Sequence, residues 1–84
     1  MDPDRTTSAI RGEIERLARR AGHDASGLAD DDLIPATGLL DSTAILELIA
    51  WYEDHFGLEI PEEVLTIDNF GSIALMAAWA QEHM

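Results

Sequence analysis

The amino-acid sequence predicts an all-α protein, a small four-helix bundle with a long first loop and a short third helix. Apolar residues recur three and four positions apart in three segments, which is the spacing of one face of a helix. Glycine or proline separates these segments and is absent from the second and the last of them. The 84 residues are enough for one hydrophobic core, so we expect a single domain over residues 1–84.

The first helix is predicted between residues 7 and 21. Its inward face is marked by apolar residues at helical spacing: Ile10, Ile14, Leu17 and Ala21. Gly22 favours a stop, because glycine readily adopts the left-handed conformation that ends helices. The arginines of this segment lie mostly off the apolar face, so we expect them in solvent.

A long connection runs from His23 to Leu40 and contains two glycines, Pro35 and a run of three aspartates. We expect it to lack regular structure. Loops of this length are uncommon in compact domains and often have a function. The aspartate run lacks the ligand spacing of a calcium loop, which favours a solvated loop. Four apolar residues are expected to hold the connection on the core: Leu28, Leu33, Ile34 and Leu39.

The second helix is predicted from Ser42 to Phe56, because this segment is apolar at helical spacing and free of glycine and proline. Its expected buried stripe consists of Ile45, Ile49, Tyr52 and Phe56, widened by Leu46 and Leu48. Its expected outer face consists of Thr43, Glu47, Ala50 and Asp54. Trp51 lies at the edge of that face, where it either contacts a partner or folds back over the long connection.

The remaining residues predict two further helical elements. Gly57 ends the second helix, and Pro61 suits the first position of a short third helix that reaches Leu65. Thr66 is expected to cap a further turn, and Ser72 to cap the last helix. The inward residues of that last helix are expected to be Ile73, Met76, Ala77 and Ala80.

Charge and composition exclude several classes of function. All five basic residues are arginines in the first twenty positions, whereas the other 64 residues carry thirteen acids and neither lysine nor arginine. The formal net charge of −12 repels nucleic acid and favours encounter with enzymes that present basic surfaces. The chain has no cysteine, its first residues lack the basic and apolar stretches typical of a secretion signal, and no apolar run comes near the ~20 residues of a membrane span. We therefore expect a cytoplasmic protein without a metal or a membrane contact, and we expect a monomer.

The stretch Gly38-Leu39-Leu40-Asp41-Ser42 delivers a serine to the start of the second helix. Free backbone N–H groups and the positive end of the helix dipole make this position suitable for a phosphate ester. An isolated Asp-Ser pair indicates little, because both residues are favoured helix caps. Here three further motifs follow in order: Gly57-Leu58-Glu59-Ile60-Pro61-Glu62-Glu63, Leu65-Thr66 and Asn69-Phe70-Gly71-Ser72-Ile73.

This ordered set resembles the acyl carrier and peptidyl carrier protein family over residues 28–81. The resemblance implies a bundle of the acyl-carrier type in which Ser42 carries 4′-phosphopantetheine from coenzyme A and Asp41 supports recognition by the transferase. The resemblance also implies a docking surface, for which we expect Leu40, Thr43, Ala44, Glu47, Ala50, Trp51 and Asp54. The implied partners are a phosphopantetheinyl transferase, an adenylating ligase or acyltransferase, and downstream synthases or transferases.

The sequence leaves the kind of carrier open. Thr43 follows the serine where fatty-acid carriers usually have leucine. The sequence motifs look closer to those of discrete stand-alone carriers and D-alanyl carriers. We therefore expect a non-catalytic, stand-alone acyl or aminoacyl carrier of specialised metabolism, of the polyketide or nonribosomal peptide type. Alternatives are a carrier of fatty-acid synthesis and, in another class, an acidic helical adaptor whose serine is only a cap. A hydrolase is disfavoured because the spacing suggests no histidine partner for Ser42.

Overall fold

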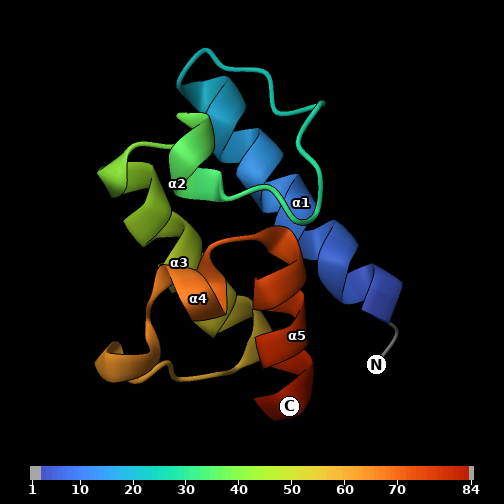
Figure 1. Ribbon diagram of the computed structural model, residues 1–84, viewed down its shortest axis with the longest axis vertical. Coiled ribbons are helices and arrows are strands. Elements are labelled where there is room, and N and C mark those ends of the chain that lie inside the picture. Colours follow the sequence, from blue (N-terminus) through green and yellow to red (C-terminus); the bar gives the residue numbers. More distant parts are fainter. Residues whose placement is uncertain (1–2, 84) are drawn as a thin grey trace.

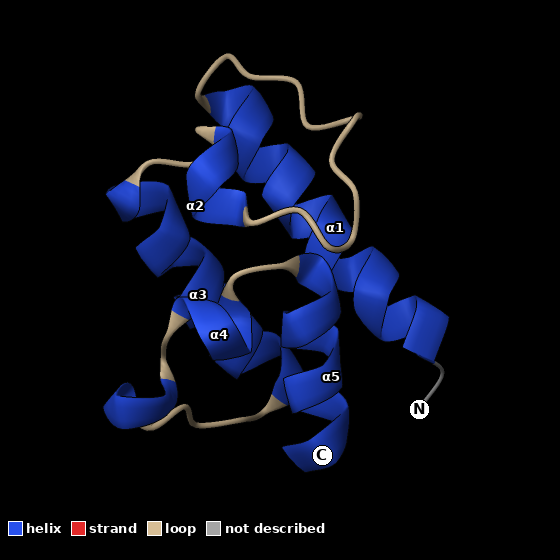
Figure 2. Ribbon diagram, viewed as in Figure 1, coloured by secondary structure: helices blue, strands red, loops and turns tan. Residues whose placement is uncertain are grey.

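The computed structural model describes residues 3–83, and this part of the chain is helical with no β-strand (Figure 2). The helices are α1 (Pro3–Arg20), α2 (Ile34–Thr37), α3 (Ser42–Phe56), α4 (Ile67–Phe70) and α5 (Ile73–His83). A short 3₁₀ helix, η1 (Glu62–Val64), lies between α3 and α4. Three of the helices are long, and the predicted all-α class is confirmed.

The long helix α1 packs against both α3 and α5, while α4 packs against α5 (Figure 1). Tyr52 of α3 is buried among these helices, and its hydroxyl donates a hydrogen bond of 2.7 Å to the carbonyl of Met76 in α5. Burial raises the pKa of the Tyr52 hydroxyl, so the group stays a neutral donor. The rings of Phe56 and Phe70 meet the Tyr52 ring edge-on.

Helix α1 begins at Pro3, four residues before the predicted start. Proline is tolerated in the first turn of a helix, where no backbone N–H is needed. Gly22 has a φ of 84°, which confirms the predicted stop. Ala21 therefore lies beyond the helix and is exposed, contrary to expectation, and Ala18 is buried in its place.

The expectation of an unstructured connection is wrong, because α2 forms inside it and ends at Gly38. Arg11 of α1 holds the connection from one side by donating to the Leu28 carbonyl at 2.6 Å and pairing with Asp30. From the other side, the Asp30 carbonyl accepts from the Ala74 N–H at 2.9 Å, and the Gly71 carbonyl accepts from Ile34 at 2.7 Å.

Two of the expected anchors of this connection, Leu28 and Ile34, are buried, and Leu39 is half-buried. Leu33, however, is exposed. Its backbone is extended, so adjacent side chains point to opposite sides, and the inward Ile34 leaves Leu33 outward.

The inward face of α3 differs from the predicted stripe, although both ends of the helix are as predicted. The buried residues are Ala44, Leu48 and Tyr52, each four positions after the last. Ile45 and Ile49 are only half-buried, and the side chain of Leu46 is 67% exposed. Compared with the prediction, α3 is therefore rotated about its axis. Ile45, Leu46 and Ile49 lie beside the buried face and not at its centre.

The predicted elements after α3 form with two changes. Gly57 ends α3 with a φ of 65°, as predicted, but the short third helix is the 3₁₀ turn η1. Thr66 precedes α4 without a capping side-chain hydrogen bond; its carbonyl instead accepts from the N–H of Phe70 at 2.8 Å. The Ser72 hydroxyl does cap α5 by accepting from Leu75 at 3.2 Å. The four predicted inward residues of α5 are all buried.

We predict that Gly71→Ala destabilises the protein. Gly71 is buried, and a Cβ atom there would clash with the Ile67 carbonyl oxygen, a backbone atom that has little freedom to move. Overpacking of this kind destabilises a protein by about 1–3 kcal/mol, so we expect a lower free energy of unfolding in urea. Gly12→Ala is the matched control, because its Cβ would meet nothing within 4 Å and alanine favours the helix by about 1 kcal/mol. Equal effects of the two changes would contradict the prediction.

Candidate functional site

Ser42 is the first residue of α3, and its side chain is exposed. Within residues 3–83, no other group forms a hydrogen bond with its hydroxyl. The turn before it depends on Gly38, which has a φ of 72° and ends α2, as expected of a glycine at this turn. The hydroxyl is therefore open to a reactant that approaches from solvent.

Asp41 caps the helix that begins with Ser42. Its carboxylate accepts a hydrogen bond of 2.8 Å from the N–H of Ala44, and its carbonyl accepts from Ile45 at 2.9 Å. In the described part of the chain, the N–H groups of Ser42 and Thr43 have no hydrogen-bond acceptor. These amides and the positive end of a 15-residue helix favour a negative charge at this position.

Thr37 shapes the same turn and was not singled out by sequence reasoning. Its hydroxyl donates to the Ile34 carbonyl at 2.6 Å and accepts from the N–H of Leu39 at 3.2 Å. These two hydrogen bonds hold the end of α2 against the loop segment that leads to Ser42. A threonine directly before the stretch Gly38-Leu39-Leu40-Asp41-Ser42 carries no distinctive signal in a single sequence.

The residues expected to form the docking surface differ in their exposure to solvent. Thr43, Glu47, Ala50 and Asp54 are exposed on α3, and Trp51 is half-buried. The Trp51 ring stacks on His55 at a centroid distance of 4.7 Å, and Trp51 also packs against the core.

The expectation that Leu40 and Ala44 contact partners is wrong. Each side chain is only 5% exposed, because Leu40 holds the end of the connection on the core and Ala44 begins the inward face of α3. They fix the position of the site from within.

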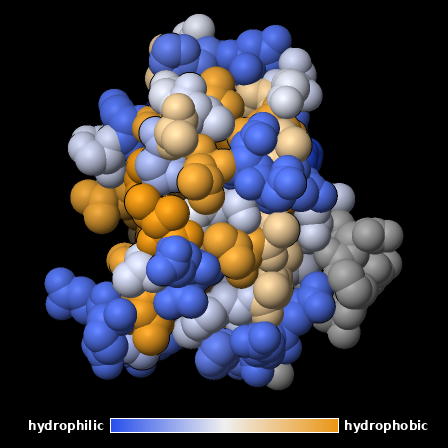
Figure 3. Space-filling model, in the orientation of Figure 1, coloured by the Kyte–Doolittle hydropathy of each residue, from blue (hydrophilic) through white to orange (hydrophobic). Residues whose placement is uncertain are grey.

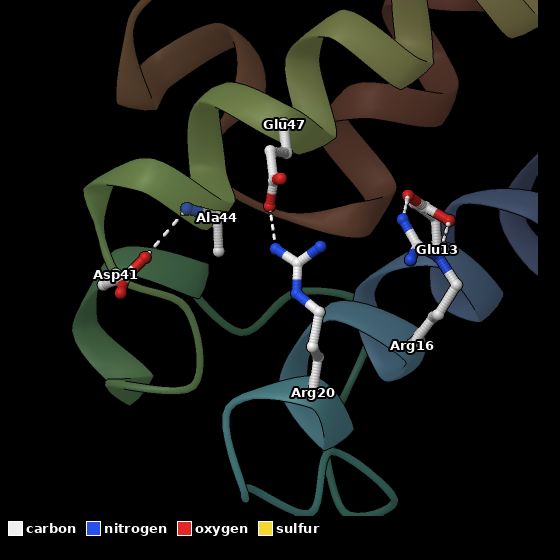
Figure 4. A network of polar contacts seen from close by, with 6 residues as sticks. All are labelled: Glu13, Arg16, Arg20, Asp41, Ala44 and Glu47. Carbon is white, nitrogen blue, oxygen red and sulfur yellow. Dashed lines mark hydrogen bonds and ion pairs between the residues drawn. The ribbon is translucent and has the colours of Figure 1, made fainter.

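Glu47 forms an intramolecular ion pair, which the sequence did not predict. Arg20 extends from the last turn of α1 and forms an ion pair with the Glu47 carboxylate (Figure 4). Nearby, the Glu13 carboxylate raises the pKa of Arg16 through hydrogen bonds of 2.9 and 2.5 Å and through its charge, with a contribution from Glu47. The concentration of all arginines in α1 was the only sequence signal for such pairing.

An apolar groove of about 170 Å³ lies beside the site, between α3 and the segments that carry α2 and α4. Its lining includes the side residues of α3, which are Ile45, Leu46 and Ile49. On the far side stand Leu65, Ile67 and Phe70. Figure 3 shows apolar side chains gathered on this face and bordered by hydrophilic ones. Sequence reasoning missed the groove, because it placed Leu46 in the buried stripe.

The fold and the site define a class of protein, an all-α domain that exposes a serine at the start of a long helix. Residues 9–80 match the family described as the phosphopantetheine attachment site, and the chain belongs to this family. The resemblance to carrier proteins is thereby confirmed, and the domain is an attachment site for covalent 4′-phosphopantetheine. No curated protein matches the chain.

Membership in the family establishes the general role. The domain is a carrier that holds a substrate linked to phosphopantetheine, and such domains are generally non-catalytic. They interact with phosphopantetheinyl transferases and with other partner enzymes. Among residues 3–83, none of the helices combines the length and the apolar character needed to span a bilayer.

We predict that Asp41→Ala lowers the free energy of unfolding by about 1 kcal/mol, because it removes the cap of α3. Asp41→Asn should be close to wild type, since asparagine caps helices as well as aspartate does. Urea denaturation of the three proteins checks this. An Asn variant as unstable as the Ala variant would show that the charge of Asp41, and not its capping bond, stabilises the site.

Proposed function

We propose that Ser42 is the residue to which phosphopantetheine is attached. The observation that carries this proposal is an exposed hydroxyl, free of hydrogen bonds in the described chain, on the first residue of a long helix. The position falls inside the matched region of the family, and the neighbouring amides of Ser42 and Thr43 suit the anionic phosphodiester that would form.

Attachment would transfer the phosphopantetheine group from coenzyme A to the Ser42 hydroxyl. The Ser42 oxygen attacks the phosphorus next to the pantetheine part of coenzyme A, and its proton passes to a base of the transferase. A P–O bond of the pyrophosphate breaks, adenosine 3′,5′-bisphosphate leaves, and a phosphodiester to Ser42 forms. The capped helix holds the serine in position, and the dipole of α3 favours the charge of the product. The attached group supplies the thiol, which the cysteine-free chain lacks.

We further propose a non-catalytic, stand-alone carrier of acyl or aminoacyl groups in specialised metabolism, loaded by an adenylating ligase or an acyltransferase. Thr43, in place of the usual leucine of fatty-acid carriers, supports this choice. The apolar groove one turn along α3 favours a cargo, or a partner side chain, with an apolar part. Mass spectrometry of the thioester trapped from the native source would identify the cargo. A fatty acyl group of ordinary chain-elongation chemistry would favour the alternative, fatty-acid synthesis.

A hydrolase that uses Ser42 is not supported by the geometry. His55 lies thirteen residues further along the same helix, which corresponds to a rise of roughly 20 Å. In the described residues, neither His23 nor His83 forms a hydrogen bond with Ser42; His83 instead bonds to the Trp79 carbonyl at 2.8 Å. Esterase activity that requires Ser42 in the absence of coenzyme A would reopen this possibility.

The attachment proposal predicts a gain of one phosphopantetheine in intact mass when the protein is incubated with coenzyme A, Mg²⁺ and a broad-specificity transferase. Ser42→Ala should abolish the gain, because the proposal places the attachment on the Ser42 hydroxyl and not on that of its neighbour Thr43. Ser26→Ala is the matched control, since Ser26 is also exposed but lies in the long connection. A folded wild-type protein that stays unmodified would favour an adaptor without a prosthetic group. Modification of the Ser42→Ala protein would place the attachment elsewhere.

We propose that partners dock on the exposed outer face of α3, formed by Thr43, Glu47, Ala50 and Asp54 with the edge of Trp51. Leu46, which sequence reasoning had placed inside, joins this surface because it is the most exposed of the large aliphatic side chains in the described chain. Exposed charge beside an exposed leucine suits weak docking by enzymes with basic, partly apolar surfaces.

We predict that Leu46→Ala lowers kcat/KM for modification about tenfold, as expected for loss of an apolar contact at an interface. Its free energy of unfolding should change by less than about 0.5 kcal/mol, because the side chain is largely in solvent. Leu75→Ala is the control, an equal truncation of a more weakly exposed leucine on α5. Equal kcat/KM values for the two variants would remove Leu46 from the docking surface.

A further inference from the structure

The carboxylates of α3 and its cap differ in what they contact. Asp41 accepts from the Ala44 N–H, and Glu53 accepts from the N–H of Ile60 at 2.8 Å, so these two acids support the backbone of the chain itself. Asp54 is exposed and has no ion-pair partner among residues 3–83. Glu47 alone in this group faces a cation of the same molecule, Arg20.

The Arg20–Glu47 pair is exposed and joins two helices. The side chains of Arg20 and Glu47 are 53% and 43% exposed. Figure 4 shows Arg20 reaching from the end of α1 toward Glu47, on the stretch of α3 that begins at the capped Ala44. An ion pair in water is weak and exchanges readily, because solvent screens both charges. A second cation can therefore take the place of Arg20 without disturbing the core.

We propose that Arg20 is an internal competitor for Glu47, so that a partner enzyme must displace Arg20 in order to pair with this acid. The proposal rests on the docking surface proposed above. The partner it fits is an enzyme whose docking surface presents an arginine or a lysine opposite Glu47. Arg20 would thereby weaken docking of every partner that uses Glu47 and leave partners that do not use it unaffected.

Arg20 is the main counter-ion of Glu47, because the other arginines of α1 described below contact other groups. Arg16 lies one helical turn before Arg20 and close enough for the Glu47 charge to help raise its pKa, but its guanidinium forms two hydrogen bonds with Glu13. Arg11 is committed to the Leu28 carbonyl and to Asp30 on the long connection. Removal of Arg20 would leave Glu47 without an ion pair in the described chain, and available to a partner.

The test measures phosphopantetheine transfer to the 84-residue protein with coenzyme A, Mg²⁺ and a broad-specificity transferase at low ionic strength. The variants are Arg20→Gln, Glu47→Gln and the double variant. Arg19→Gln is the matched control, because Arg19 is exposed, lies in the same helical turn, and makes no ion pair among residues 3–83. It removes the same charge, and so reproduces any change in long-range attraction between carrier and enzyme.

Arg20→Gln should lower KM by about two- to fivefold relative to Arg19→Gln, the range expected of an exposed ion pair, with kcat unchanged. Glu47→Gln should raise KM, and in that background Arg20→Gln should have no effect beyond that of Arg19→Gln. High salt should reduce these differences. Circular dichroism of each variant confirms that the helices are retained.

An unchanged KM for Glu47→Gln would remove Glu47 from the docking surface, and the competition with it. Where Glu47→Gln raises KM, two outcomes would overturn the competition. One is an Arg20→Gln protein that behaves like Arg19→Gln or is modified more slowly. The other is an Arg20→Gln effect that persists when Glu47 is also replaced. If the wild-type protein itself acquires no phosphopantetheine, the attachment at Ser42 fails instead. A normally modified wild type with no response to Arg20→Gln refutes only the competition.

Discussion

The site depends on the burial of two apolar anchors, one on either side of three exposed residues. Leu40 and Ala44 are in the core, whereas Asp41, Ser42 and Thr43 between them are in solvent. Because both anchors are fixed, the chain between them has little freedom, and the Asp41 cap sets the direction of α3. A carrier serine must be accessible and yet held at a defined place, and this arrangement provides both conditions.

The arginines have a structural role that the net charge conceals. Arg11 ties the long connection to α1, and Arg20 ties α3 to the same helix. The remainder of the chain is acidic, so α1 supplies the positive charge within an otherwise negative protein. The two contacts differ in consequence: Arg11 also bonds a backbone carbonyl, whereas Arg20 meets only a side chain in solvent and is free to exchange.

Local signals made the ends of α3 predictable, and tertiary packing made its faces unpredictable. Asp41 and Gly57 bound the helix by chemistry that is visible in the sequence, a capping carboxylate and a residue that accepts positive φ. The choice between Ile45 and Ala44 as the inward residue depends on where α1 lies, which periodicity does not encode. The same limit applies to the groove, because its two walls are distant in sequence. Attachment at Ser42 was inferred from motif order and stays a prediction.

Helix α3 separates three tasks on three sides. Its inward residues hold the core, its side residues line the apolar groove, and its outer residues carry charge. A substitution of Glu47 or Asp54 on the outer face can then alter docking without loosening the core, because both are exposed. Ile45 and Ile49, in contrast, line the groove and also pack against the core. The outer contacts are exposed and individually weak, which favours fast release. A carrier that passes its cargo among several enzymes needs brief encounters, and an ion pair that exchanges between Arg20 and a partner would help to keep them brief.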